Sequence, residues 1–373
     1  EETRVGVFVC NCGINIGGIA NVPEIAEYAR TLPEVAYVQE NLFSCSEDAQ
    51  NQMIDVIKEH NLNRVVVAAC SPSADEREWA KATLGTKHLY ADYAQLLAHP
   101  GLDAVFLVTP NTVHPEQIIA GLRAGKHVFC EKPLSLELDE CLAVEAEAAR
   151  HPRLKVMIGY VRRFDASYQD AQKKIASGAI GRPFLVRSQT TDMNDPSGFF
   201  VRFAPKSGGI FLDMSVHDID AARWLLGAPQ PKRVFSVGTI AVHDGLADCG
   251  DVDNGVAVCE FEGGAMATIY ASRTMAHGHE TTTEIVGTAG RLVVGRDGRL
   301  NQVEIADGHG IRTETTPTFW ERFEDAFLRE TVHFVDCVRF DRPPGLTLHD
   351  ATEATRIGIA LRTSLVERRA VEL

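Results

Sequence analysis

Two short segments of the sequence carry side chains suited to acid–base chemistry, and the first contains a lysine. In AGKHVFCEKPLSL, Glu131-Lys132-Pro133 follows an apolar run that is typical of a buried strand. We expect Lys132 at the carboxyl end of a parallel strand, where doubly wound sheets bind ligands. Pro133 restricts the backbone of Lys132 to extended conformations and permits a cis bond, so the ammonium can point over the sheet edge. A turn with an exposed lysine is the plainer alternative.

The second segment, GGIFLDMSVHDIDAARWL, pairs a carboxylate with an imidazole. Asp213 and His217 have the spacing i, i+4 in a helix that we expect over 211–226, so both side chains lie on one helix face. Histidine is the usual general base near neutral pH, and a nearby carboxylate favours its protonated form. The alternative is an amphipathic helix in which His217 is an ordinary surface residue and Asp218 and Asp220 are solvated.

The elements that position these residues follow from hydrophobic periodicity. Up to about residue 160, short β-branched runs alternate with helical patterns, which indicates βαβ units. We therefore predict a doubly wound, Rossmann-like parallel sheet of the α/β class. Its strands are expected at 4–10, 36–41, 64–70, 103–108, 127–130 and 154–158.

After about residue 182 the alternating runs become longer, and Glu-Gly-Gly at 262–264 marks a hairpin turn. This pattern predicts an α+β domain with a large open, mostly antiparallel sheet. Two more helices are expected near 318–340 and 349–368. We predict two domains, 1–160 and 161–373, and clefts between such domains are favoured ligand sites.

Composition limits the possible partners. The 373 residues are 45% hydrophobic and 24% charged, as in an ordinary globular protein, and carry a formal net charge of −14. That charge argues against nucleic acid and anionic membranes, because polyanions are repelled, and it favours a small-molecule substrate. No apolar run approaches the ~20 residues of a membrane helix. The chain opens with Glu1-Glu2 rather than a basic leader, so we expect a cytoplasmic protein without a membrane partner.

Most of the chain, roughly residues 73–373, resembles the glucose-fructose oxidoreductase, inositol dehydrogenase and rhizopine catabolism (Gfo/Idh/MocA) family. The resemblance is carried, in order, by HLYADYAQLLAHPGLDAVFLVTPN, HPEQIIAGLRAGKHVFCEKPLSL, IGYVRRFD and GGIFLDMSVHDIDAARWLLG. Inositol 2-dehydrogenases look most similar, on the strength of GYVRRFDASY, FLDMSVHDID and FWERFEDAF. The family's fold joins an N-terminal dinucleotide-binding domain to a C-terminal domain whose open sheet supports oligomers.

The resemblance implies an NAD(P)-dependent oxidoreductase that oxidises a secondary hydroxyl of a cyclic polyol or sugar by hydride transfer to nicotinamide. His217 would take the hydroxyl proton, Lys132 would hydrogen-bond the developing alkoxide and the nicotinamide ribose, and Asp213 would hold a substrate hydroxyl. Further residues match family positions. Those lining the cofactor are Pro110, Asn111, His114, Glu131, Lys132 and Pro133, and those near nicotinamide and substrate are Tyr160 and Arg163.

The resemblance breaks at the start of the chain, where the family has a Gly-x-Gly-x-x-Gly turn that lets backbone amides reach a pyrophosphate. Alignment of the first strands puts Val9, Asn11 and Ile14 where those glycines belong. Residues 3–72 instead resemble the N-terminal domain of the iron–sulfur flavoprotein component of heterodisulfide reductase. The matching stretches are RVGVFVCNCGINIGG, VPEIAEYARTLPEVAYVQENLFSCSEDAQ and IKEHNLNRVVVAACSP.

The chain therefore looks like a fusion whose joint lies near residues 69–72. One hypothesis is a dehydrogenase whose cofactor lies along the edge formed by residues 9–18. The other is a recombined fold that binds dinucleotide poorly or not at all and has no activity. Candidate cofactor contacts on that edge are Gly13, Gly17, Gly18 and Ser71. Because no acidic residue ends the third strand, the choice between NAD and NADP stays open.

Four of the nine cysteines, Cys10, Cys12, Cys45 and Cys70, fall in the first 70 residues. If the first three strands are parallel, all four thiols face one sheet edge. Four convergent thiolates can ligate an iron–sulfur cluster, which gives a third hypothesis, an iron–sulfur redox module. Against it, cysteine is often buried as a small apolar residue, and the spacing matches no ferredoxin run. No other metal site is expected.

The expected partners are therefore a small polyol or sugar and further copies of the chain. An open sheet face must be covered or protected, which suggests a homodimer or homotetramer.

Overall fold

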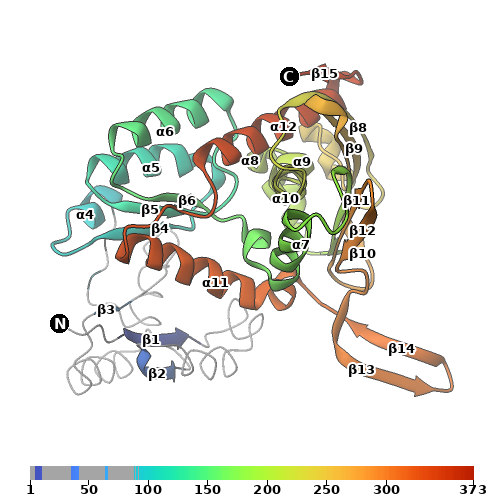
Figure 1. The fold of residues 1–373 in the computed structure, drawn as a ribbon, viewed down its shortest axis with the longest axis horizontal. Helices are drawn as coiled ribbons and strands as arrows, with labels where there is room; N and C mark the ends of the chain where they lie inside the picture. Colours follow the sequence, from blue (N-terminus) through green and yellow to red (C-terminus); the bar gives the residue numbers. More distant parts are fainter. Residues whose placement is uncertain (1–4, 11–34, 42–63, 66–87, 89, 91) are drawn as a thin grey trace. The chain divides into compact units, whose positions relative to one another are not determined.

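The computed structural model describes residues 5–10, 35–41, 64–65, 88, 90 and 92–373 of the 373-residue chain (Figure 1). The chain forms two compact units, Glu1–Leu102 and Asp103–Leu373. Every candidate catalytic residue belongs to the second unit.

The first unit contains a three-stranded parallel sheet. Strand β1 (Val5–Cys10) lies between β2 (Val35–Asn41) and β3 (Arg64–Val65), and it pairs in parallel with both. The β-branched runs thus form parallel strands as predicted, although only the first two residues of the expected strand 64–70 fall in the described β3. The short helix α4 (Tyr93–Leu97) begins after Asp92, whose carboxylate accepts from the backbone amide of Ala94 at 2.7 Å.

The second unit begins with another parallel sheet, of order β4-β5-β6. The expected strand 127–130 matches β5, whereas β4 and β6 are slightly shorter than expected, and two helices provide the crossovers, as the alternating pattern predicts. The apolar strand residues Leu107, Val128 and Ile158 are buried. The elements are β4 (Ala104–Leu107), α5 (His114–Arg123), β5 (His127–Cys130), α6 (Leu138–Arg150) and β6 (Val156–Ile158).

A seven-stranded sheet follows, with the order β12-β11-β7-β10-β9-β8-β15. Only β7 and β10 pair in parallel, so the sheet is mostly antiparallel, as expected. The β9–β10 hairpin turns at Glu262–Gly264, where Gly263 has a φ of 74°. The strands are β7 (Pro183–Met193), β8 (Pro231–Thr239), β9 (Asn254–Phe261), β10 (Met266–Met275), β11 (Glu280–Gly287), β12 (Gly290–Val294) and β15 (Val371–Glu372).

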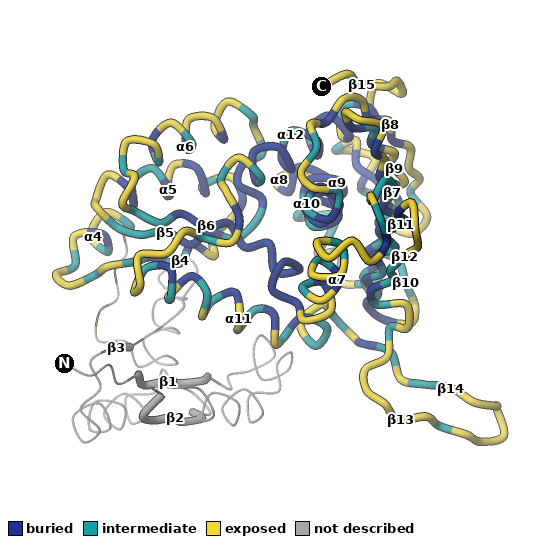
Figure 2. The backbone as a smooth tube through the Cα atoms, viewed as in Figure 1, coloured by how far each residue is buried: buried dark blue, intermediate teal, exposed yellow. Residues whose placement is uncertain are grey.

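Helices cover one face of this sheet, and the other face is open (Figures 1 and 2). On the covered face, the Ser236 hydroxyl on β8 donates to the Leu361 carbonyl of α12 at 2.6 Å. On the open face the alternate residues are apolar and exposed, among them Phe235 at 42%, Val237 at 52% and Val256 at 46%. The two faces of the sheet thus differ, with one packed against helices and the other lined by exposed apolar side chains.

The remaining elements are helices and one hairpin. The helices are η3 (Val161–Phe164), α7 (Ala166–Ala176), α8 (Phe199–Ser207), α9 (Ile210–Asp213), α10 (Val216–Leu225), α11 (Phe319–Arg339) and α12 (Leu348–Glu367). The last two begin at capping boxes, Thr318 with Glu321 and Thr347 with Asp350, and confirm the two expected C-terminal helices. Strands β13 (Arg299–Asp307) and β14 (Gly310–Thr315) form a separate hairpin.

Candidate active site

Lys132 lies just beyond the carboxyl end of β5, as predicted. The peptide bond between Lys132 and Pro133 is cis. The lysine ammonium, with its side chain 22% exposed, donates to the main-chain carbonyl of Asp213 at 2.7 Å and approaches that residue's carboxylate at 3.4 Å. Strand β5 and the residues at the α9–α10 junction therefore meet through Lys132.

The single helix expected over 211–226 is wrong, because the structure has two helices, α9 and α10, separated at Met214 and Ser215. In a continuous helix the Asp213 carbonyl would accept from the amide of His217. Here that carbonyl accepts from Lys132 instead. Asp213 therefore ends one helix and His217 lies in the first turn of the next, which is a different arrangement from two residues on one helix face.

The Asp213 carboxylate is held between two cations. Arg273 on β10 donates to Oδ2 at 2.8 Å, and Lys132 approaches Oδ1 at 3.4 Å. Burial alone would raise the pKa of Asp213, but the charges and hydrogen bonds of Lys132 and Arg273 outweigh burial and lower it. Asp213 is thus a carboxylate at neutral pH and serves as a hydrogen-bond acceptor.

The surroundings of His217 favour its uncharged form, whereas those of Asp213 favour the charged form. Burial, followed by the charges of Lys132, Arg162 and His279, lowers the pKa of His217 well below its ordinary value. The expected effect of a nearby carboxylate, which would favour the protonated form of His217, is therefore absent, since Asp213 is paired with Lys132 and Arg273. Nδ1 of His217 is buried and has no hydrogen-bond partner in the described part of the chain. The imidazole is neutral and ready to accept a proton.

Tyr160 and Arg163 lie at and within η3. Tyr160 is fully buried, its ring meets the His217 ring edge-on at 6.2 Å, and its hydroxyl has no partner among the described residues. Arg163 donates to both carboxylate oxygens of Asp220, at 2.9 and 2.6 Å, and lies 3.5 Å from Asp350. Its guanidinium is thus committed to an ion pair, and its predicted role near the substrate stays a prediction.

A second ion pair lies beside the first. Arg162 donates to Asp218 at 2.7 Å, and Asp218 also accepts from Thr190 on β7 at 2.8 Å. Asp218 and Asp220 are 0% and 1% exposed, so the alternative in which they are solvated is wrong. The consecutive arginines and the i, i+2 aspartates are visible in the sequence, but nothing in it pairs them.

The residues that match the family's cofactor-lining positions follow the carboxyl ends of β4 and β5. Pro110 is exposed, whereas the buried Asn111 donates to the Ser207 carbonyl at 3.4 Å. His114 bridges two loops, with Nδ1 at 2.8 Å from the Pro133 carbonyl and Nε2 at 2.9 Å from the Thr109 carbonyl. These contacts hold the ends of the two strands together.

Glu131, the residue before Lys132, is an acidic side chain whose surroundings raise its pKa. Burial raises the pKa of Glu131, and burial with the charges of Glu131 and Asp220 raises that of Glu330 on α11 well above its ordinary range. Glu131 is packed against Gly159, where an added Cβ would lie 3.2 Å from the Glu131 Oε2 atom. Gly159 therefore leaves the space that this carboxyl group occupies.

The sequence did not single out Arg273, Asp192 or His279. His279 is buried and its Nδ1 lies 2.9 Å from Asp192, at the carboxyl end of β7. Asp192 is two residues beyond Thr190 and so lies on the same, helix-covered face of the sheet. Only the pairing of strands brings these polar side chains together, and local sequence carries no signal for it.

Several predicted residues lie outside the described residues: Gly13, Gly17, Gly18, Ser71, Cys12, Cys45 and Cys70. Cys10 is the last residue of β1, at the carboxyl end of a strand with two parallel neighbours. The iron–sulfur site thus stays a prediction. Within the described residues, no three His, Cys, Asp or Glu side chains are arranged to hold a metal ion. No helix in the described part of the chain is long and apolar enough to cross a membrane.

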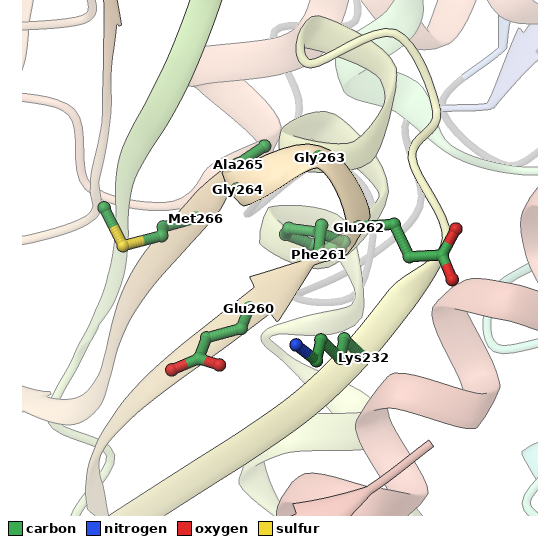
Figure 3. Close-up of a pocket in the computed structure, with 8 residues that line it drawn as sticks. All are labelled: Lys232, Glu260, Phe261, Glu262, Gly263, Gly264, Ala265 and Met266. Atoms are coloured by element: carbon green, nitrogen blue, oxygen red, sulfur yellow. The ribbon is translucent and has the colours of Figure 1, made fainter.

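A surface pocket occurs elsewhere, at the β9–β10 turn (Figure 3). It is lined by residues 260–266 of the turn and the strand ends that flank it, and Figure 3 shows Lys232 on the neighbouring strand β8. None of the candidate catalytic residues contributes to it. The pocket is therefore separate from the proposed chemistry.

Comparison with known proteins assigns the family. Residues 47–160 match the oxidoreductase family with an NAD-binding Rossmann fold, and residues 168–293 match the GFO/IDH/MocA C-terminal domain. The scyllo-inositol 2-dehydrogenase (NAD(+)) of Bacillus subtilis is 36% identical over 308 residues, which are 83% of this chain and 88% of that protein. The chain belongs to the GFO/IDH/MocA family. Its fold is accordingly a Rossmann-like domain with a parallel sheet and a C-terminal domain with a mostly antiparallel sheet.

Other members of the GFO/IDH/MocA family are similar over most of their length. The myo-inositol 2-dehydrogenase of Thermotoga maritima is 34% identical over 86% of this chain and 96% of its own. The structure of scyllo-inositol dehydrogenase from Lactobacillus casei with bound NAD(H) and scyllo-inositol has a TM-score of 0.80 and 31% identity, and the match covers 100% of this chain and 99% of that one. The oxidoreductase assignment made from the sequence motifs is confirmed.

The family match also bears on the first 72 residues. It begins at residue 47, inside the segment that resembles heterodisulfide reductase. That second resemblance, and the fusion inferred from it, stay predictions. The predicted domain boundary after residue 160 stays a prediction as well.

Proposed function

We propose that this protein is an NAD(P)-dependent dehydrogenase that oxidises a ring hydroxyl of inositol or a similar cyclic polyol. The observation that carries the proposal is the grouping of Lys132, Asp213 and His217 with two different charge states, an ionised carboxylate and a neutral imidazole. Polyol oxidation needs a group that binds hydroxyls and a base that takes one proton. The names and the bound ligands of the relatives favour inositols as the first substrates to test.

The residues of the second unit fit the nicotinamide end of a dinucleotide. The buried polar atoms without a hydrogen-bond partner among the described residues include the Tyr160 hydroxyl, His217 Nδ1 and Arg273 Nε. Buried polar groups are normally hydrogen-bonded, so these atoms are suited to bind cofactor and substrate. We propose that Pro110, Asn111, Glu131, Lys132 and Pro133 line the nicotinamide side, and that His114 holds the loops that carry them.

In the proposed mechanism the substrate lies among three side chains. Asp213 accepts a hydrogen bond from one hydroxyl and so fixes the ring orientation. The neutral His217 accepts the proton of the reacting hydroxyl, for which Nδ1 has no partner among the described residues. Lys132 donates a hydrogen bond to the oxygen as negative charge develops on it. When bound, NAD(P) supplies the hydride acceptor for the carbon-bound hydrogen.

We also propose a homodimer or homotetramer, because exposed apolar residues line the open face of the large sheet. A cytoplasmic location fits the five cysteines in the described second unit, all of which are free thiols. NADP is retained as an alternative to NAD, since the residues expected to meet the adenosine ribose lie outside the described residues.

The test is a spectrophotometric assay of the purified protein with NAD and with NADP against scyllo-inositol, myo-inositol and a panel of acyclic polyols and sugars. We expect reduced nicotinamide with at least one inositol and calorimetric binding of one dinucleotide. A protein that binds neither dinucleotide would support the recombined fold, which the missing glycine turn motivates. A protein that binds NAD(P) but oxidises no polyol would reject the substrate class alone.

A further inference from the structure

Arg273 is a buried cation that the sequence motifs do not include. It lies on β10, and its side chain is 5% exposed. Its Nη2 atom donates to the Asp213 carboxylate at 2.8 Å, and its guanidinium lies 4.8 Å from the centre of the Phe200 ring on α8. Nε is buried and has no hydrogen-bond partner within the part of the chain that the structure describes.

The position of Arg273 is set by the sheet. The β7–β10 pairing is irregular between Ser272 and Met275, and such irregularities redirect side chains next to active sites. The backbone amide of Arg273 donates to the Asp253 carbonyl at 2.9 Å, which fixes the strand there. The guanidinium therefore reaches Asp213 from a rigid element rather than from a loop.

Asp213 is bound by two cations, which contact it at different atoms. Lys132 binds its main-chain carbonyl at 2.7 Å and its carboxylate at 3.4 Å, whereas Arg273 binds only the carboxylate, at 2.8 Å. Without Arg273, the carboxylate would have Lys132 as its one cationic partner among the described residues. It would then turn toward the ammonium, which the reaction needs for the developing alkoxide.

We propose that Arg273 is a positioning residue that holds the Asp213 carboxylate in place and keeps the Lys132 ammonium available to the reacting oxygen. The consequence for catalysis rests on the proposed function, but the ion pair itself does not. Because Arg273 keeps Asp213 ionised, Asp213 binds a substrate hydroxyl and leaves proton removal to His217. The unpartnered Nε–H adds a donor for a neighbouring hydroxyl of the same ring.

The first test compares Arg273→Gln and Arg273→Lys with the wild type in steady-state kinetics, with Arg233→Gln as the matched control. Arg233 is an exposed arginine of β8 that binds Glu260 at 2.8 Å. We expect Arg273→Gln to raise KM for inositol about 10-fold and to lower kcat/KM about 100-fold, as for a disrupted buried charge pair. NAD affinity should stay at the wild-type value. Arg273→Lys should recover part of the loss, and Arg233→Gln should match the wild type.

Separate measurement of KM and kcat distinguishes a positioning role of Arg273 from a general loss of folded enzyme. A merely structural loss would reduce the fraction of active enzyme, so kcat would fall while KM for inositol stayed constant. That result, or wild-type kinetics in Arg273→Gln, would overturn the proposal.

The second test needs no turnover. A double-mutant cycle on urea unfolding compares the wild type, Arg273→Gln, Asp213→Asn and the double variant. We expect the double variant to be more stable than the sum of the two single losses predicts, because the two side chains interact. Strict additivity would reject the ion pair. An inactive wild type with a non-additive cycle would reject the proposed polyol oxidation and leave the pairing of Arg273 with Asp213 intact.

Discussion

At the scale of single residues, the surroundings of two titratable groups in the site favour different charge states. Burial and neighbouring cations favour the neutral form of His217, and Lys132 and Arg273 favour the charged form of Asp213. Opposite preferences in neighbouring groups assign their roles, because a base must be unprotonated and a hydroxyl acceptor benefits from charge. Lys132 contributes to both shifts, so it couples the two groups.

Replacement of His217 by Ala removes the proposed base. We expect kcat to fall about 10²- to 10⁴-fold with little change in NAD affinity. The pKa of His217 is lowered from its ordinary value of 6.5. Activity requires the neutral imidazole, which is present above that pKa, so the kcat/KM plateau of the wild type should extend below pH 6.5. A pH–rate profile whose acid limb lies above pH 6.5 would contradict this assignment.

Replacement of Lys132 by Met removes a donor to the developing alkoxide. We expect kcat to fall about 10²- to 10³-fold. Because the Lys132 charge helps to lower the pKa of His217, the acid limb of the residual activity should also move to higher pH. The measurement is a pH–rate profile of the variant beside the wild type. An unchanged acid limb would show that Lys132 and His217 do not interact.

At the scale of elements, two buried ion pairs fasten η3 to α10. Arg162 binds Asp218 and Arg163 binds Asp220, at 2.7 and 2.6 Å. Asp218 also bonds Thr190, so α10 is tied to β7 as well. His217 therefore lies in the first turn of a helix that is fixed on two sides. These contacts explain how α10 can hold His217 in one place although the helix does not continue into α9.

Removing one partner of these ion pairs should lower the free energy of unfolding of the second unit. Replacement of Asp218 by Asn leaves Arg162 buried without its charged partner, which should cost about 3–5 kcal/mol of unfolding free energy. The exposed pair of Arg233 with Glu260 provides the control, and Arg233→Gln should cost less than about 1 kcal/mol. Urea unfolding measures both. Equal losses in the two variants would mean that burial adds nothing to the first pair.

Local pattern was sufficient for most elements and insufficient for their junctions. The strand at 127–130 and the helix starts at Thr318 and Thr347 follow from β-branched runs and capping residues. The break between α9 and α10 does not, because the freed Asp213 carbonyl there accepts from Lys132, which is 81 residues away in sequence. Arg273 was missed for the same reason, since only the sheet brings it to Asp213.

At the scale of the whole molecule, motif order identified the family although the glycine turn is missing. Ordered motifs span most of the chain, so one lost segment does not hide the relationship. Charge states were beyond the sequence, because they depend on burial: a nearby carboxylate was expected to favour the protonated form of His217, but burial and neighbouring cations lower its pKa. The roles of Gly13, Gly17, Gly18 and Ser71 stay predictions.

The open sheet face offers a test of assembly. Val256 and Val258 point outward on β9, with exposed fractions of 46% and 39%. If this face joins copies of the chain, Val256→Lys should reduce the mass measured by light scattering to that of a smaller species, because burying an unpaired ammonium is costly. Val242→Lys, at an exposed valine just beyond β8, should leave the mass unchanged. An identical mass in all three proteins would place any interface elsewhere.

The central claim is that a carbon-bound hydrogen of a cyclic polyol passes to nicotinamide at the Lys132–Asp213–His217 site. The most direct measurement uses inositol deuterated at its ring carbons, with NAD or NADP, followed by mass spectrometry of the reduced cofactor. We expect one deuterium in each reduced nicotinamide and a large loss of that product in His217→Ala. Reduced cofactor without deuterium, or equal labelling by His217→Ala and the wild type, would contradict the claim.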